Sequence, residues 1–314
     1  MKTGRIGLAV LLGVALSSAL ACSSAPAVKA PLTDSWGRAI NLEKPPGRIV
    51  SHVPGITESL FALGLGDKVV GVSQYCDYPP EARAKPKVGS YARPDLETII
   101  SMQPDLVLTN GYTTGLVQQL ESVDIGGKKT AVVVLQAKSI EEVIANLELL
   151  GKVTGTEAKA GELVQNMRGR ISAVTSKVQQ ARSKPRVYYE VQGSEYPKLW
   201  TAGPGSYVDE LIALAGGQNI ADGATKGYPQ ISSERVVAAD PEVIIVADGR
   251  YGISLSQVKE RTGWESITAV KKGAIYLIDS DLTQRDGPRL VDGLEEIAAL
   301  LHPELGFGRP GASP

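Results

Sequence analysis

The feature that most constrains the fold of this chain is an internal repeat. One copy contains Tyr91, Glu97 and the run 104–108, and the other, 137 residues later, contains Tyr228, Glu234 and the run 241–245. A second pair of similar segments, 58–69 and 209–220, lies upstream of these copies at an offset of 151 residues. Two blocks in the same order predict two similar lobes. A cleft between such lobes is a favoured place for a small ligand.

The N-terminus has the pattern of an export signal. Lys2 and Arg5 precede the apolar stretch 6–16 and a run of small residues that ends at Ala21. We therefore interpret residues 1–21 as a signal peptide, which is too short to span a membrane alone. Residues 18–22 are similar to a bacterial lipobox, so cleavage would leave Cys22 as a lipidated N-terminus with 22–31 as a tether. An ordinary cleaved signal is the alternative.

Charge and cysteine content narrow the class of protein. Without Lys2 and Arg5, 31 basic residues face 34 acidic ones, which argues against nucleic-acid binding, as does the lack of a basic run. With Cys22 lipidated, Cys76 would have no disulfide partner, and a free cysteine usually packs as a small buried hydrophobe. We expect an exported protein on the periplasmic or cell-surface face of a membrane.

Apolar runs alternate with helical patterns through most of the mature chain. We expect strands at 48–51, 69–72, 105–108, 130–135, 186–191, 243–247 and 274–278. Thr57 is expected to cap the helix after the first strand. This alternation predicts an α/β fold in which parallel-type sheets are flanked by helices. The two lobes would comprise residues 32–155 and 183–305.

The region between the lobes has a different composition. Residues 139–182 lack proline and keep apolar residues at helical spacing. We predict one helix packed on the first lobe, followed by a single long bridging helix over 156–182. A last helix is expected over 289–301, and residues 306–314 are expected to form a loose tail.

The residue types in the predicted cleft favour binding over catalysis. The motifs of hydrolases and phosphate loops are absent, and two histidines are too few for a histidine-based metal site. We therefore expect no catalytic residue and no metal site. His52 is expected to pair with loop backbone, the alternative being an axial ligand to a bound metal centre. His302 is expected to lie at the end of the last helix.

The aromatic residues suggest the kind of ligand. Eleven tyrosines accompany two phenylalanines, and several fall in predicted loops at strand ends. The candidates that could face the cleft are Tyr75, Tyr78, Tyr91, Tyr112, Tyr228 and Tyr251, with Trp200 as a further one. Tyr75 and Tyr78 lie in a proline-rich loop, 74–87, that the second lobe lacks. Amphipathic rings at the mouth of a cleft suit a large, flat, partly polar ligand.

Two carboxylates occupy equivalent places near helix starts, Glu97 in one lobe and Glu234 in the other. Each is favoured there by the helix dipole, which could be their whole role. Because both keep the same spacing from a tyrosine, we expect them to dock a two-fold partner that carries arginines.

Several stretches together resemble one family of transport proteins. They are 48–51 with Thr57 and Glu58, 71–73 with 77–79, Glu97 with 102–107, and 287–289. With the signal, the two lobes and the bridging helix, they resemble helical-backbone (class III) periplasmic substrate-binding lipoproteins. Members of this class serve ABC importers of iron–siderophore complexes, haem and cobalamin. The resemblance covers about residues 32–305.

The stretch 71–80 is most similar to that of the cobalamin-binding members. This resemblance implies a corrinoid or another metal chelate held by tyrosine faces, with Pro54, Arg285 and Asp286 at its polar rim. It also implies an ABC permease homodimer, with its ATPase, that receives Glu97 and Glu234. Asn110 departs from the pattern, since cobalamin members can carry an aromatic there.

Three alternatives remain open at this stage. Arg93, Arg250 and Arg285 could receive an anionic ferric siderophore, and haem is a further ligand of the class. A two-lobed metallocluster enzyme would need more Cys and His ligands than Cys76 and His52 provide. A surface receptor or scavenger protein without an importer is the third.

Overall fold

The N-terminal lobe is built on a parallel sheet in the computed structural model, which describes residues 1, 31–90, 92–112, 114–125 and 128–308. The strand order is β2-β1-β3-β6. The strands are β1 (Ile49–Ser51), β2 (Val69–Val72), β3 (Leu106–Thr109) and β6 (Ala131–Val134). Every residue of β1 and β3 is buried, as expected for central strands covered by helices on both faces.

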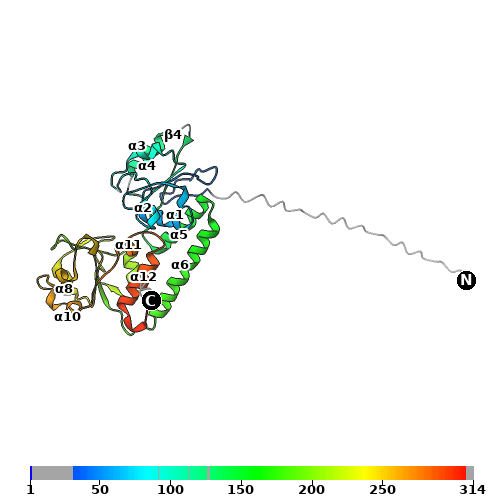
Figure 1. Ribbon diagram of the computed structural model, residues 1–314. Helices are drawn as coiled ribbons and strands as arrows, with labels where there is room; N and C mark the ends of the chain where they lie inside the picture. The colour runs from blue at the N-terminus through cyan, green and yellow to red at the C-terminus, as the bar shows by residue number, and fades with distance from the viewer. Residues whose placement is uncertain (2–30, 91, 113, 126–127, 309–314) are drawn as a thin grey trace. The chain divides into compact units, whose positions relative to one another are not determined.

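Short helices connect and cover these strands (Figure 1). They are α1 (Pro54–Ala62), the 3-10 turn η1 (Gly66–Lys68), α2 (Pro80–Arg83), α3 (Leu96–Ser101) and α4 (Thr114–Ser122). A small antiparallel hairpin, β4 (Asp124–Ile125) with β5 (Lys128–Lys129), follows α4. It was not expected from the sequence.

The C-terminal lobe is built on a mixed sheet of order β10-β8-β7-β11-β12, with β9 paired to β7. Its strands are β7 (Arg186–Gln192), β8 (Leu199–Thr201), β9 (Gln218–Asn219), β10 (Gln230–Ile231), β11 (Val243–Val246) and β12 (Ile275–Leu277). The expected strands run parallel, whereas β8 and β10 pair antiparallel and were missed. Strands of two or three residues are too short for a period-2 pattern to show.

The helices of this lobe follow the same pattern of short segments. They are α7 (Tyr207–Leu214), α8 (Ser233–Ala239), η2 (Gly249–Tyr251), α9 (Leu255–Lys259), η3 (Trp264–Ser266), α10 (Thr268–Lys272), α11 (Ser280–Thr283), α12 (Leu290–Leu301) and η4 (Pro303–Leu305). Serine side chains cap the N-termini of α7, α8 and α9 by accepting hydrogen bonds from backbone N–H groups.

The backbone confirms the main repeat. Gln103 and Asp240, which are 137 residues apart, both adopt the left-handed conformation, with φ of 47° and 44°. The following strands, β3 and β11, pair in the same way with β1 and β7. The carboxylate of Asp105 accepts a hydrogen bond from the backbone N–H of Arg48. In the second lobe, the carboxylate of Glu242 accepts one from the backbone N–H of Arg186 in the same way. The two lobes therefore share one helix–turn–strand unit in atomic detail.

The second repeat block needs a correction of one residue. After α1, the N–H of Leu65 donates to the carbonyl of Leu60, and after α7, that of Gly217 donates to Ile212. These equivalent hydrogen bonds are 152 residues apart, whereas the match of apolar runs predicts an offset of 151. The ends of the helices therefore define the structural equivalence better than the apolar runs do. On this register Glu58 of α1 corresponds to Glu210 of α7.

Two long helices, α5 (Ile140–Thr154) and α6 (Glu157–Val178), connect the lobes. Figure 1 shows α6 running beside α5 and α12. Its 22 residues span about 33 Å. The helix is shorter than the predicted 156–182 because residues 179–181 form a tighter turn.

The placement of α5 differs from the expectation. Ile140 and Leu147 pack in a core cluster with strands and helices of the C-terminal lobe. Leu150 and Val153, further along the same helix, pack in the core of the N-terminal lobe. Instead of packing on the first lobe alone, α5 contributes to the cores of both lobes.

The helix α1 begins earlier than predicted. Pro54 occupies its first turn, and Val53 rather than Thr57 is the N-cap residue. The hydroxyl of Thr57 donates to the carbonyl of Val53 inside the helix, which a side chain in the helix interior can do. The last helix, α12, begins at Leu290, one residue later than expected. Among the described residues, no helix has the length and apolar character needed to cross a bilayer.

Candidate binding site

A cavity of about 750 Å³ lies between residues of the two lobes. The N-terminal side contributes Val53, Pro54, Gly55, Tyr75, Asn110, Tyr112, Gln136, Ala137 and Lys138, and the C-terminal side contributes Gly205, Ser206, Tyr207, Lys226, Gly227, Tyr228, Tyr251, Gln284, Arg285 and Asp286. Its size falls in the usual range for small-molecule sites. Most of these residues follow strands or precede helices, as expected for ligand sites of open α/β sheets.

Six residues proposed from the sequence line this cavity: Pro54, Tyr75, Tyr112, Tyr228, Arg285 and Asp286. Tyr75 comes from the proline-rich loop that follows β2. Tyr112 follows β3, and Tyr228 precedes β10 in the other lobe. The tyrosines therefore reach one space from loops that are far apart in the sequence.

Tyr78 and Trp200 lie outside the described lining of the cavity. The Tyr78 ring stacks on the guanidinium of Arg289, with 3.8 Å from the guanidinium carbon to the ring centroid. Trp200 lies on β8, paired with Gln230 of β10. Tyr91 and Cys22 lie outside the described residues.

Tyr251, a seventh residue that the sequence placed in a loop at a strand end, also lines the cavity, and so does Tyr207, which no sequence pattern indicated. Tyr251 lies in the loop after β11, and Tyr112 lies in the corresponding loop after β3. Tyr207 is the first residue of α7, and its hydroxyl donates to the carbonyl of Gln284. No local pattern reveals that long-range contact.

The phenols of Tyr207 and Tyr228 in the cavity stay uncharged at neutral pH. Burial raises the pKa of Tyr228 to about 12, and a hydrogen bond with Tyr207 opposes the shift only partly. Burial also raises the pKa of Tyr207, with the charge that Tyr228 would carry adding to the effect. Neutral phenols present an aromatic face together with a hydroxyl that can donate and accept hydrogen bonds.

Arg285 is part of a dense network of ion pairs at the edge of the cavity. Its guanidinium lies 3.0 Å from Glu58, 2.8 Å from Asp77 and 2.8 Å from Asp281. Burial disfavours the charge, but these carboxylates raise the pKa of Arg285. Arg285 therefore faces the cavity with its charge already compensated.

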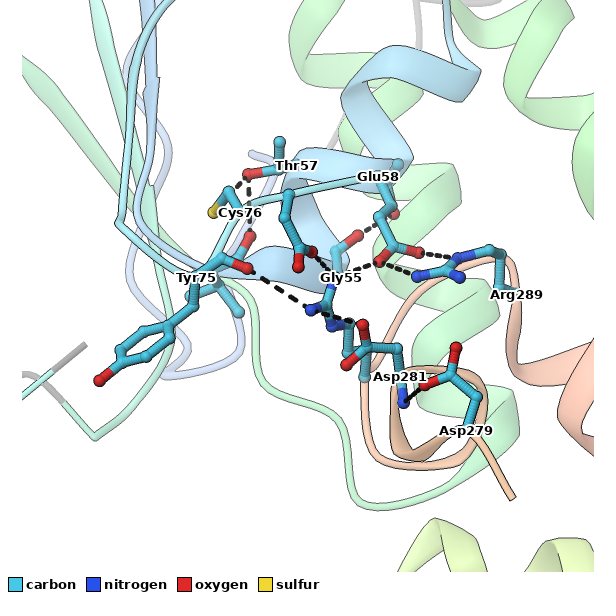
Figure 2. A network of polar contacts seen from close by, with 12 residues as sticks. Gly55, Thr57, Glu58, Tyr75, Cys76, Asp279, Asp281 and Arg289 are labelled. Atoms are coloured by element: carbon cyan, nitrogen blue, oxygen red, sulfur yellow. Dashed lines mark hydrogen bonds and ion pairs between the residues drawn. The ribbon is translucent and has the colours of Figure 1, made fainter. Parts of the chain in front are cut away.

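The network also joins the two lobes. Figure 2 shows Arg289 at the start of α12 reaching Glu58 on α1. Arg289 donates to both carboxylate oxygens of Glu58, at 2.8 and 2.7 Å. The equivalent residue, Glu210, accepts a hydrogen bond from the backbone N–H of Ile140 at 2.8 Å. Thus both glutamates of the second repeat block make contacts beyond their own helices.

Asp286 lies where the backbones of the two lobes approach closely. A Cβ on Gly55 would stand 2.7 Å from the backbone carbonyl carbon of Asp286, and one on Gly287 would stand 3.0 Å from the carbonyl oxygen of Gly55. Only glycines allow this approach. Burial raises the pKa of the Asp286 carboxyl to about 6, and the charge of Glu58 adds to the effect.

Glu97 and Glu234 occupy the same position in their helices. Glu97 follows the N-cap Asp95 by two residues in α3, and Glu234 follows the N-cap Ser232 by two residues in α8. Both side chains are exposed, and neither lines the cavity. Hydrogen bonds from backbone N–H groups and from Ser232 lower the pKa of Glu234.

His52 and Cys76 are buried beside β1 and β2. A ring nitrogen of His52 lies 3.0 Å from the carbonyl oxygen of Ser90, the loop-backbone contact expected from the sequence. Cys76 is a free thiol, and its Sγ lies 3.1 Å from the Oγ1 of Thr57, within hydrogen-bond distance. Burial raises the pKa of this thiol. Within the described parts of the chain, no group of three or more His, Cys, Asp or Glu side chains is arranged to hold a metal ion.

Comparison with known proteins places this fold and cavity in a family. Residues 49–282 match the model of a periplasmic binding protein family, and the chain belongs to that family. A related ABC transporter substrate-binding lipoprotein of Bacillus subtilis, YvrC, is 33% identical over 277 residues, 87% of this chain and 85% of the relative. A cobalamin-binding protein of Halobacterium salinarum is 32% identical over 278 residues, 86% and 73% of the two chains.

Solved structures show the same architecture. The periplasmic vitamin B12-binding protein BtuF of Vibrio cholerae superposes with a TM-score of 0.69 at 26% identity, covering 83% of this chain and 99% of that one. The apo haem-binding protein RhuT from Roseiflexus gives a TM-score of 0.71 at 27% identity, covering 82% and 98%. The chain is thus the substrate-binding component of an ABC importer, and its relatives are binding proteins rather than enzymes.

Proposed function

We propose that this protein captures a corrinoid, such as cobalamin, between its lobes and delivers it to an ABC permease. The observation that carries the proposal is the set of tyrosines around the 750 Å³ cavity, contributed by both lobes. Tyrosine faces combine apolar contact with hydrogen bonding, which suits a large ring system whose edge carries polar groups. Relatives that are named for cobalamin or vitamin B12 support this choice of ligand.

A ferric siderophore or haem is the second candidate, supported by the haem-binding neighbour. The arginines that would favour an anionic siderophore are already engaged or lie elsewhere. Arg285 is surrounded by carboxylates, and Arg250 lies 2.7 Å from Asp281. Arg93 is exposed and outside the described lining of the cavity. These three arginines therefore give no specific support to an anionic ferric chelate.

Titration of the purified protein with cyanocobalamin, cobinamide, haem and ferric siderophores tests the ligand. Visible absorbance and tryptophan fluorescence would follow binding. We expect a corrinoid to bind with the highest affinity. Tight binding of haem or of a ferric siderophore, with no response to either corrinoid, would contradict the proposal.

Delivery is proposed to depend on Glu97 and Glu234, exposed at equivalent sites on the two lobes. Charge-assisted hydrogen bonds to arginines of a permease homodimer would orient the complex. Because single exposed ion pairs are weak, Glu97→Ala or Glu234→Ala alone should lose little, whereas the double variant should lose transport.

The test pairs ligand affinity in solution with uptake, or with ATPase stimulation by the permease complex. A matched control removes two exposed glutamates of the connecting helices, Glu148 and Glu162. We expect normal ligand affinity in both double variants and a transport defect only for the Glu97 and Glu234 pair. Normal transport by that pair, or a defect explained by lost ligand binding, would refute the docking role.

The N-terminal region is proposed to anchor the protein. In this account residues 1–21 are removed as a signal, Cys22 carries lipid, and residues 22–31 tether the two-lobed unit that begins at Leu32. The lipoprotein name of the Bacillus relative supports this arrangement. Cys22→Ser should leave the protein uncleaved or released from membranes. Fractionation and mass spectrometry would detect either outcome, and unchanged processing and membrane association would contradict the anchor.

A further inference from the structure

Lys138 and Lys226 give the cavity a pair of cationic groups from opposite lobes. Apart from tyrosines, the ionisable side chains in the described lining of the cavity are those of Lys138, Lys226, Arg285 and Asp286. Their charges are not equally available to a ligand. Arg285 is paired with Glu58, Asp77 and Asp281.

Lys138 stands at a fixed point of the N-terminal side. It directly precedes Ser139, whose side chain caps α5. The backbone N–H of Lys138 donates to a carboxylate oxygen of Glu142 at 2.6 Å. These two hydrogen bonds fix the backbone at the point where the Lys138 side chain begins. The side chain is exposed, and no described carboxylate forms an ion pair with its ammonium group.

Lys226 stands across the cavity in the loop between β9 and β10. Its aliphatic stem lies near Gly205, where a Cβ would come within 3.9 Å of the Lys226 Cδ. The next residue, Gly227, holds the loop in place: its N–H donates to the carbonyl of Pro204, and its carbonyl accepts from Gly203. In the described part of the chain this ammonium group also has no carboxylate within ion-pair distance.

We infer that Lys138 and Lys226 form a two-lysine subsite that receives an anionic oxygen group of the ligand and so sets its orientation between the lobes. The inference rests on the proposed corrinoid function. In cobalamin the group would be the phosphodiester of the nucleotide loop, which cobinamide lacks. An ammonium group acts on a phosphate as a compact charge with three donors.

This arrangement predicts a specificity for one class of corrinoid. A corrinoid that carries the phosphodiester would contact both lobes through this anionic group. Cobinamide lacks the group and would be held by the tyrosine rings of the cavity alone. Removing both charges should lower the affinity for cyanocobalamin on the order of tenfold, as expected for the loss of charge-assisted hydrogen bonds. The affinity for cobinamide should stay within about twofold of the wild-type value, because its contacts with the tyrosines are unchanged.

The experiment compares Lys138→Gln/Lys226→Gln with a control, Lys271→Gln/Lys272→Gln, that removes two exposed lysines of α10. Both variants change the net charge equally. Affinities for cyanocobalamin and cobinamide would be measured at low and high salt, with melting temperatures to verify folding. We expect only the cavity variant to lose affinity, only for cyanocobalamin, and to show a weaker salt dependence than the wild-type protein.

Each result has a definite meaning. Unchanged cyanocobalamin affinity, or equal losses for both corrinoids, would overturn the two-lysine subsite while leaving the proposed function intact. If the wild-type protein binds neither corrinoid, the proposed function fails, and the assignment of the subsite to a corrinoid phosphodiester fails with it. An equal loss in the control variant would show that only net charge matters, which also overturns the subsite.

Discussion

Removing the charge of Glu58 alone should destabilise the protein unusually strongly for the loss of a single carboxylate. The Glu58 side chain is 2% exposed. It accepts one hydrogen bond from Arg285 and two from the guanidinium of Arg289, through Nε and Nη2. Glu58→Gln keeps the shape but removes the charge, which leaves the largely buried guanidinium of Arg289 without its described ion-pair partner, whereas Arg285 keeps Asp77 and Asp281. Breaking a buried pair on one side costs about 3–5 kcal/mol. Because both arginines keep some solvent contact, we expect a value near the lower limit, about 3 kcal/mol.

Thermal and urea unfolding, followed by circular dichroism, would measure this loss. At about 2.1 cal/mol/K of unfolding entropy per residue, about 3 kcal/mol corresponds to roughly 5 °C in Tm for a protein of this size. Glu141→Gln is a matched control, because Glu141 also accepts two hydrogen bonds from one arginine, Arg168, but lies on the surface with 65% of its side chain exposed. The control should cost less than about 1 kcal/mol. Similar losses in the two variants, or a change of less than about 1 kcal/mol for Glu58→Gln, would refute the reasoning.

Three further outcomes follow from burial and close packing. Asp286 has its pKa raised from 3.8 to about 6, so its ionisation costs stability as the pH rises through that interval; Asp286→Asn should stabilise the protein by about 3 kcal/mol above pH 7 and by nothing below about pH 4. A flat difference in urea-unfolding free energy from pH 4 to 8 would contradict this. Gly55→Ala should cost about 1–3 kcal/mol in the same assay, since the new Cβ would meet the backbone of Asp286, and a neutral effect would show that the lobes separate freely. The buried Cys76 thiol, whose pKa is raised, should react with a thiol reagent only after unfolding in a chain that begins at Ser23, and rapid reaction of the native protein would disprove its burial.

The sequence predicted the architecture well where local patterns repeat. The strands expected around Val107 and Ile244 lie at equivalent places in two sheets, because buried parallel strands need continuous apolar runs. The antiparallel strands that contain Trp200 and Ile231 were missed, because strands this short cannot show a period-2 pattern. The helix α5 was assigned to the first lobe alone, which was wrong because its apolar residues pack in the cores of both lobes.

The site was predictable to the extent that it follows strand ends. Tyr75, Tyr112 and Tyr228 could be selected because loops at one edge of parallel sheets converge on a ligand. The compensation of Arg285 could not be foreseen, because its partner Glu58 lies 227 residues away in the sequence. The stacking of Tyr78 on Arg289 likewise depends on how the lobes meet.

The central claim, that the tyrosine-lined cavity between the lobes holds a corrinoid, is tested most directly by calorimetric titration with cyanocobalamin. The wild-type protein would be compared with Tyr112→Ala/Tyr228→Ala and with Tyr196→Ala, an exposed tyrosine outside the described lining of the cavity. We predict one cyanocobalamin per wild-type protein, an affinity about ten- to a hundredfold lower for the double variant through lost stacking, and a nearly unchanged affinity for Tyr196→Ala. No saturable binding to the wild-type protein, or equal affinity in all three proteins, would contradict the account.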